Sequence, residues 1–205
     1  YSGEMKTMSL KEIAENYYSR LSGLLGQIQA TQKDGIGMDF FATAEFVGQL
    51  AMTQTENGKK IIFIGNGASA SISSHMATDY WKSGGMRAIA FNDASLLTCL
   101  SNDCGYENVF GKSVEMFADE GDILVAISSS GKSENILNGV YAARKQGAHV
   151  VTLSGFKPDN PLRSMGDINF FVPDVDYGPV EIVHLSITHC ILDSVIDLKV
   201  KMVSK

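Results

Sequence analysis

The sequence predicts an α/β protein built on a doubly wound, mostly parallel sheet. From Lys60 onward, short apolar segments alternate with stretches of helical spacing, and this alternation is typical of right-handed strand–helix–strand crossovers. The apolar segments lack polar alternation, as expected of strands that are covered on both faces. Five strands are predicted, over residues 61–64, 87–91, 123–127, 149–153 and 168–172.

Helical patterns precede and follow these strands. Residues 9–29 carry an apolar stripe, with Ser9 as the candidate N-cap, and a second helix is predicted over 38–54. We therefore expect an N-terminal helical hairpin. A long helix over 179–203 closes the chain, and Pro179 suits its first turn. The apolar surface of the two leading helices indicates a subunit interface, with packing inside the monomer as the alternative.

Length and composition favour one domain over residues 1–205, with oligomer-forming helices over 1–57 and an α/β core over 58–205. The formal charge of 17 minus 23, or −6, argues against a nucleic-acid partner. We expect a cytoplasmic protein without a membrane partner, because no apolar stretch approaches the length of a membrane span and no signal-peptide core is evident. Three cysteines without a Cys-x-x-Cys pair disfavour disulfides and a thiolate zinc site.

A serine-rich turn follows the third predicted strand. It contains Ser128, Ser129, Ser130, Gly131 and Ser133, and a helix is predicted to begin directly after it. Hydroxyl groups beside the N-terminus of a helix suit a phosphate monoester, and ligands of open α/β sheets bind at this edge. The alternative is that the serines only cap the helix. Four serines within six residues favour anion binding.

The first predicted strand ends in a glycine-rich turn that contains Asn66 and Ser69. This turn would form the second wall of the same crevice, although a tight strand-to-helix connection explains it equally well. The turn lacks the third glycine of a dinucleotide fingerprint. In the helix that follows, His75 and Asp79 share one face, where a surface contact is the commoner explanation than a ligand pair.

The terminal helix carries Glu181, His184 and His189 amid apolar residues. Spacing favours a pair between Glu181 and His184, because about 12 Å of axial rise separates Glu181 from His189 in a regular helix. His189 can still lean toward the start of the helix. A half-buried histidine that is satisfied by hydrogen bonds is the alternative for both histidines.

Four segments carry a family resemblance: Gly65-Asn-Gly-Ala-Ser69, Ser101-Asn-Asp-Cys-Gly-Tyr-Glu-Asn-Val-Phe110, Ile127-Ser-Ser-Ser-Gly-Lys-Ser133 and the helix from Glu181 to His189. Together they resemble the sugar isomerase (SIS) family and, within it, the phosphoheptose isomerases. The resemblance implies a tetramer of flavodoxin-like subunits with active sites at the subunit interfaces. It also implies the interconversion of sedoheptulose 7-phosphate and D-glycero-D-manno-heptose 7-phosphate, often with zinc.

Matching the motifs also carries residue roles over to this chain. The family's metal and catalytic positions fall on His75, Asp79, Glu181 and His189. We expect Asp79 and His189 to act as the acid–base pair of an isomerisation through an enediol. The phosphate-binding hydroxyls fall on Ser128, Ser130 and Ser133, with Ser129 beside them, and further substrate contacts fall on Asn66, Ser69, Asn102, Asp103 and Glu181.

The chain departs from the family pattern at several positions. Asp79 replaces a glutamate, Glu181 replaces a glutamine, and Ser83 replaces an arginine for which Lys82 is a candidate substitute. Gly178 and Pro179 replace an Asp-Arg pair. These changes keep two alternatives open: a non-catalytic SIS protein that binds a sugar phosphate or, like DiaA, a protein partner; and an isomerase of another phosphosugar.

Overall fold

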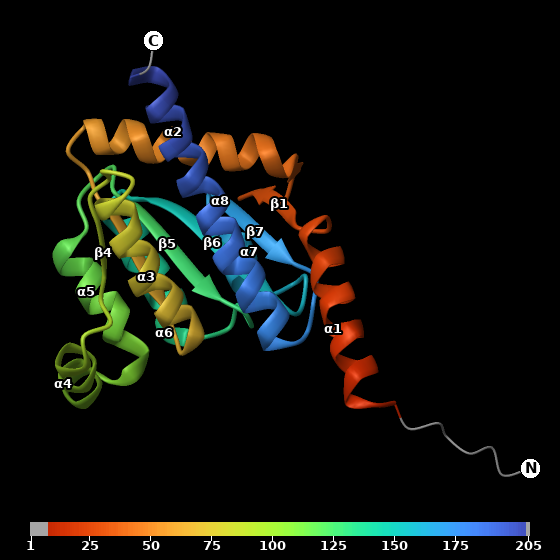
Figure 1. The fold of residues 1–205 in the computed structure, drawn as a ribbon. Coiled ribbons are helices and arrows are strands. Elements are labelled where there is room, and N and C mark those ends of the chain that lie inside the picture. The colour runs from red at the N-terminus through yellow and green to blue at the C-terminus, as the bar shows by residue number, and fades with distance from the viewer. Residues whose placement is uncertain (1–7, 204–205) are drawn as a thin grey trace, which may run out of the picture.

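The computed structural model describes residues 8–203 and shows a seven-stranded sheet with helices on both faces (Figure 1). The strand order is β2-β1-β7-β6-β5-β3-β4. The five predicted strands are confirmed and pair in parallel: β3 (Ile61–Gly65), β4 (Ala88–Ala90), β5 (Ile123–Ser128), β6 (His149–Gly155) and β7 (Ile168–Val172). Their carboxyl ends share one edge of the sheet, which is where parallel sheets place their ligands.

The prediction of only five strands is wrong, because the N-terminal region adds two more. Strand β1 (Gln29–Gln32) pairs antiparallel with β7, and β2 (Gly37–Met38) pairs antiparallel with β1. The turn between them contains Gly35, whose φ of 81° suits a glycine, and the Ile36 amide donates to Asp34 Oδ1 at 3.1 Å. The sequence pattern ended the first helix at Gln29, the first residue of β1, and assigned no strand to the residues that follow.

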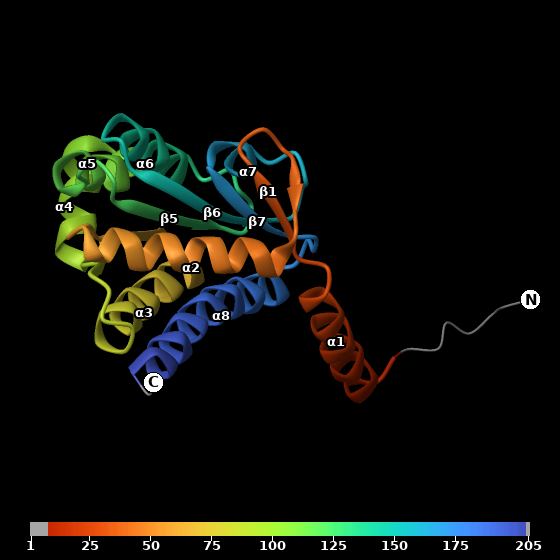
Figure 2. The same ribbon diagram turned by 90° about the horizontal axis from the view of Figure 1, so that it is seen from above.

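The two leading helices are confirmed, but they do not form a hairpin, because the β1–β2 hairpin separates them. Helix α1 (Leu10–Leu25) begins at the predicted N-cap Ser9, whose side chain forms a capping box with Glu12. Helix α2 (Phe40–Glu56) is capped by Asp39, which accepts a hydrogen bond from the Ala42 amide at 2.9 Å. Figure 2 shows α1 projecting away from the sheet while α2 runs across it, and both helices contact α8 (Tyr177–Val203).

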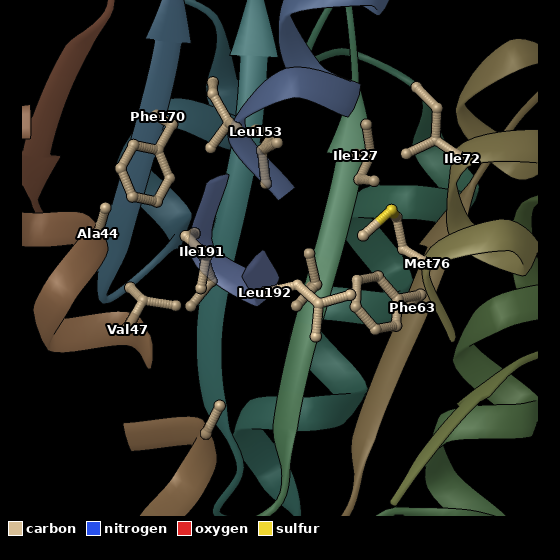
Figure 3. Packing of buried hydrophobic residues seen from close by; sticks show 14 of the residues in the cluster. Ala44, Val47, Phe63, Ile72, Met76, Ile127, Leu153, Phe170, Ile191 and Leu192 are labelled. Carbon is tan, nitrogen blue, oxygen red and sulfur yellow. The ribbon is translucent and has the colours of Figure 1, made fainter. Parts of the chain in front are cut away.

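Two hydrophobic cores lie on the opposite faces of the sheet. One face is covered by α2, α3 (Ala68–Lys82) and α8, and Figure 3 shows strand residues such as Phe63, Leu153 and Phe170 facing Met76 and Leu192. The other face is covered by α4 (Ala94–Cys104), α5 (Val109–Phe117), α6 (Glu134–Lys145) and α7 (Pro161–Met165). A short 3-10 helix, η1 (Tyr106–Asn108), links α4 to α5.

Helix α8 starts two residues before the predicted terminal helix. Its segment Tyr177–Met202 is long and apolar enough to cross a membrane by length and composition, so the expectation that no stretch reaches this length is wrong. Half of its most apolar window is nevertheless buried inside the fold, where Val183, Ile187 and Leu192 pack in the core. A largely buried core helix can be as long and as apolar as a helix that spans a bilayer.

Candidate active site

The serine loop, residues 128–133, turns sharply between β5 and α6. Gly131 has a φ of 63°, and a Cβ atom there would lie 2.0 Å from Asn160 Oδ1, so only glycine fits. The Gly131 amide donates to Ser128 Oγ at 3.2 Å, and the hydroxyls of Ser128 and Ser133 lie 3.4 Å apart. Ser133 makes no side-chain cap on α6, so the alternative that the serines only cap this helix does not hold for its hydroxyl.

Ser129 supplies the polar atom that most clearly lacks a partner in this loop. Its residue is 4% exposed, and its Oγ atom has no hydrogen-bond partner among residues 8–203. Buried hydroxyls are normally satisfied, and an exception calls for an explanation such as a ligand. Ser129 lines the same pocket as Ser128, Ser130 and Ser133, and hydroxyls grouped beside a helix N-terminus suit a phosphate.

The turn after β3 forms the opposite wall of a pocket of about 260 Å³. A Cβ atom on Gly65 would lie 2.5 Å from the Ser69 carbonyl oxygen, so glycine permits the close return of the chain into α3. The pocket is lined by Asn66 to Ser69 from this turn, by Ile127 to Ser130 and Ser133, and by Tyr177 and Glu181 of α8. The predicted crevice between the two turns is therefore present.

A group of potential metal ligands is formed by α3 and α8. Ligand atoms of His75, Asp79 and His189 lie within 4.8 Å of one another. His75 Nε2 is 3.2 Å from Asp79 Oδ2, and the rings of His75 and His189 have centroids 5.5 Å apart. Two imidazoles and one carboxylate fit a catalytic zinc site, which takes three protein ligands and keeps one position open. The donor set therefore suits the expected ion.

Glu181 does not join this group of three ligands, in contrast to the expected set of four. It lies eight residues before His189 on α8, about 12 Å of axial rise, and it faces the pocket with the serine loop instead. Burial raises the pKa of the Glu181 carboxyl, because a partly desolvated carboxylate is disfavoured. The side chain is placed to contact a ligand in the pocket.

His184 is a core residue, so the pair with Glu181 that the spacing favoured is not formed. The side chain is fully buried, and its Nε2 atom lies 3.1 Å from the carbonyl oxygen of Ser154 on β6. Because a carbonyl only accepts, Nε2 carries the proton. Burial lowers the pKa of His184 to about 4. His184 is therefore a fully buried core histidine rather than a half-buried one, and it is only partly satisfied, because its Nδ1 atom has no hydrogen-bond partner among residues 8–203. Helix α8 turns His189 to the other side.

The chain is similar to known proteins in both sequence and fold. A family model described as the SIS domain matches residues 16–155. The chain belongs to the SIS-domain family. Phosphoheptose isomerase from Aliarcobacter butzleri is 36% identical over 153 residues, which cover 72% of this chain and 80% of that protein. Phosphoheptose isomerase from Campylobacter concisus is 35% identical over 164 residues, covering 77% and 86%.

A solved structure extends the SIS-domain comparison to nearly the whole chain. Phosphoheptose isomerase GmhA from Neisseria gonorrhoeae superposes with a TM-score of 0.80 at 27% identity, covering 91% of this chain and 98% of that one. The superposition therefore extends well beyond residues 16–155, the part of the chain that the SIS-domain model matches. The fold that the sequence predicted is thus that of a SIS-domain protein.

Two expected substrate contacts of the SIS-domain site do not line the pocket. Asn102 and Asp103 lie on α4, where Asn102 Nδ2 donates to Asp103 Oδ1 at 2.8 Å, and both are exposed. The Nζ atom of Lys82, the candidate substitute for an arginine, lies 3.6 Å from Asp79 Oδ1.

Tyr177 lines the pocket but was not predicted from the sequence. The predicted last helix began at Pro179 and so left Tyr177 outside any element.

Proposed function

We propose that the protein is a phosphosugar aldose–ketose isomerase that interconverts sedoheptulose 7-phosphate and D-glycero-D-manno-heptose 7-phosphate. The observation that carries this proposal is the hydroxyl-lined pocket of the serine loop, which includes Ser129 with its buried Oγ atom that lacks a partner among the described residues. The same chain brings together His75, Asp79 and His189 as a group of potential metal ligands. The relatives named phosphoheptose isomerase, at 35% and 36% identity, support the choice of substrate.

The reaction requires a proton to move between two neighbouring carbons. A base takes the proton from the carbon beside the carbonyl while an acid protonates the carbonyl oxygen, which gives an enediol. The former carbonyl carbon then takes up a proton while the hydroxyl on the other carbon loses one, which gives the other sugar. We assign these transfers to Asp79 and His189. His75, 3.2 Å from the Asp79 carboxylate, orients this group. The serine loop holds the phosphate and thereby fixes the distant reacting end.

A divalent ion, in our proposal zinc, would be held by His75, Asp79 and His189. When bound, it would supply Lewis-acid polarisation of the substrate oxygens. Because a side chain cannot hold the ion and carry a proton at once, Asp79 and His189 would exchange as ligands during turnover. Glu181 stands at the pocket and is assigned to substrate contact, together with Asn66, Ser69 and the four serines. Asn102 and Asp103 on α4 complete the proposed substrate contacts, although the pocket in this subunit does not include them.

The proposed assembly is a homotetramer of single SIS domains in the cytoplasm, without a nucleic-acid or membrane partner. Support comes from exposed apolar side chains on α2 and α8, such as Phe41 at 75% and Leu198 at 44%, which line a mostly apolar groove of about 450 Å³ between these helices. Burial of such a surface favours association. A phosphorylated sugar does not cross a bilayer unaided, so we place the enzyme where its substrate is made.

The decisive experiment measures aldose formation from sedoheptulose 7-phosphate by the purified protein, both metal-free and with added zinc. Zinc-dependent product would support the reaction and the His/Asp/His site together. Calorimetry of sedoheptulose 7-phosphate binding is run in parallel. Binding without product under any metal condition would contradict the proposed function and favour a non-catalytic sugar-phosphate-binding protein. Product from another phosphosugar alone would contradict only the substrate assignment.

A further inference from the structure

Asn66, at the pocket wall, takes part in a hydrogen-bond network that reaches two other elements. Its Nδ2 atom donates to Asn135 Oδ1 at 2.9 Å, and Asn135 Nδ2 donates back to Asn66 Oδ1 at 2.9 Å. The hydroxyl of Tyr106 also donates to Asn66 Oδ1, at 2.9 Å. Asn135 lies in the first turn of α6 and is 2% exposed, whereas Tyr106 begins η1. Three segments far apart in the sequence therefore meet at one amide.

The hydrogen-bonding capacity of Asn66 is almost exhausted by this network. A side-chain amide offers two acceptor sites on oxygen and two N–H donors. Tyr106 and Asn135 occupy both acceptor sites, and one N–H is given to Asn135. One N–H donor of the Asn66 amide therefore remains unused, and Asn66 lines the pocket. Such a group recognises an oxygen of a ligand and cannot receive a hydroxyl proton.

The partners of Asn66 are themselves held in place. Asn135 sits directly after the serine loop, on the helix whose N-terminus faces the pocket. On the other side, Asn138 Nδ2 of α6 donates to the carbonyl oxygen of Glu107 at 2.8 Å, which ties η1 to α6 next to Tyr106. Neither partner lines the pocket, so neither is placed to touch a ligand there.

We propose that Tyr106 and Asn135 are positioning residues that lock the Asn66 amide as a hydrogen-bond donor to an oxygen of the bound phosphosugar. The proposal rests on the proposed function for the identity of that ligand. Fixing the orientation of a donor in advance removes the need to order it during binding, and a pre-organised hydrogen bond is correspondingly stronger. Tyr106 thereby also links η1, which directly follows the substrate-contact candidates of α4, to the pocket wall.

The test uses Tyr106→Phe, which removes one hydroxyl and leaves the ring. We expect the KM for sedoheptulose 7-phosphate to rise about fivefold, with kcat changed less than twofold, because the Asn66 amide loses one of the hydrogen bonds that hold it toward the substrate. A merely structural role would lower the fraction of folded enzyme, and hence kcat, with KM unchanged. The matched control is Tyr141→Phe, since Tyr141 is 58% exposed on α6 against 55% for Tyr106 and lies outside the pocket.

A double-mutant cycle with Asn66→Ala decides whether Tyr106 acts through Asn66. We expect Tyr106→Phe to have no further effect on KM once the Asn66 side chain is absent. An equal effect in both backgrounds, or an unchanged KM in Tyr106→Phe alone, would overturn the proposal. If the unmutated protein binds sedoheptulose 7-phosphate without turnover, the same cycle is measured on the dissociation constant by calorimetry, so that failure of the proposed function and failure of this proposal remain distinct.

Discussion

Nε2 of His75 lies 3.2 Å from Oδ2 of Asp79, one helical turn further along α3. The same carboxylate has Lys82 Nζ 3.6 Å from its other oxygen. Asp79 thus lies between an imidazole ring and an ammonium group, one near each of its two oxygens. A carboxylate that is oriented in this way is placed to act as a base or to bind a cation, and His189 approaches it from α8.

Replacing Asp79 with asparagine should remove turnover without unfolding the protein. Asparagine keeps the size of the side chain but cannot take up a proton, so we expect kcat to fall by about a hundredfold to ten-thousandfold. His189→Ala should show a loss of the same order. The control is Glu15→Gln, an exposed carboxylate on α1 that lies near Lys11. Circular dichroism checks the fold, and activity within tenfold of the unmutated enzyme in both variants would contradict the acid–base assignment.

Ser129→Ala should separate stability from binding. Its hydroxyl is buried without a partner among the described residues, so its removal should leave the free energy of unfolding unchanged or raise it by about 1 kcal/mol. The same change should raise the KM for the phosphosugar, because a phosphate ligand loses a donor. Thermal unfolding and steady-state kinetics measure the two effects.

The control for this variant is Ser113→Ala, since the Ser113 hydroxyl is buried but donates to the Val109 carbonyl at 3.0 Å. We expect that change to leave KM unaltered. A Ser129 variant with the KM of the unmutated protein would exclude this hydroxyl from the phosphate site.

Gly131→Ala should disrupt the serine loop more than an alanine elsewhere at a positive φ. The new Cβ would lie 2.0 Å from Asn160 Oδ1, and the φ of 63° adds a backbone penalty of about 1 kcal/mol or more. Gly35→Ala is the matched control, because its φ is 81° but its Cβ would meet open space. Urea unfolding should show a larger loss at Gly131, together with weaker phosphosugar binding. Equal losses would mean that the loop accommodates the methyl group.

His184 predicts a pH dependence of stability. Its pKa is lowered to about 4 in the fold, whereas the unfolded chain takes up this proton near the ordinary value of about 6.5. Its contribution is therefore complete above pH 6.5 and is lost as the pH falls toward 4, with a total on the order of 3 kcal/mol. In His184→Gln this part of the acid sensitivity should vanish. Denaturant unfolding at several pH values measures it, and parallel curves for both proteins would refute the assignment.

Local sequence patterns were sufficient for much of the fold and of the site. The cap at Ser9, the five parallel strands and the turn at Ser128 to Ser133 follow from residues that are neighbours in the chain. Strand β1 was missed because only two of its four residues are buried and its partner β7 lies about 140 positions away. A segment this short and polar becomes a strand through pairing, which no local pattern reveals.

The histidines of α8 show the corresponding limit for the site. Spacing along a helix tells which residues share a face, but which face meets the sheet is decided by packing. Val183 and Ile187 pack in the core, and His184 lies buried on the same side of α8. His189 lies on another side of the helix and joins the potential metal ligands of α3. Likewise, the bond between Tyr106 and Asn66 joins residues 40 positions apart, and only the structure reveals it.

The added hairpin of β1 and β2 also decides how the sheet ends. Without it, the five-residue β7 would present a row of free backbone groups at the border. With it, the sheet terminates in β2, of two residues, on one side and in β4, of three residues, on the other. Such short edge strands leave few backbone N–H and C=O groups with which a further strand could pair, and this protects a sheet against edge-to-edge aggregation. The hairpin thus helps to keep a strongly apolar sheet from polymerising.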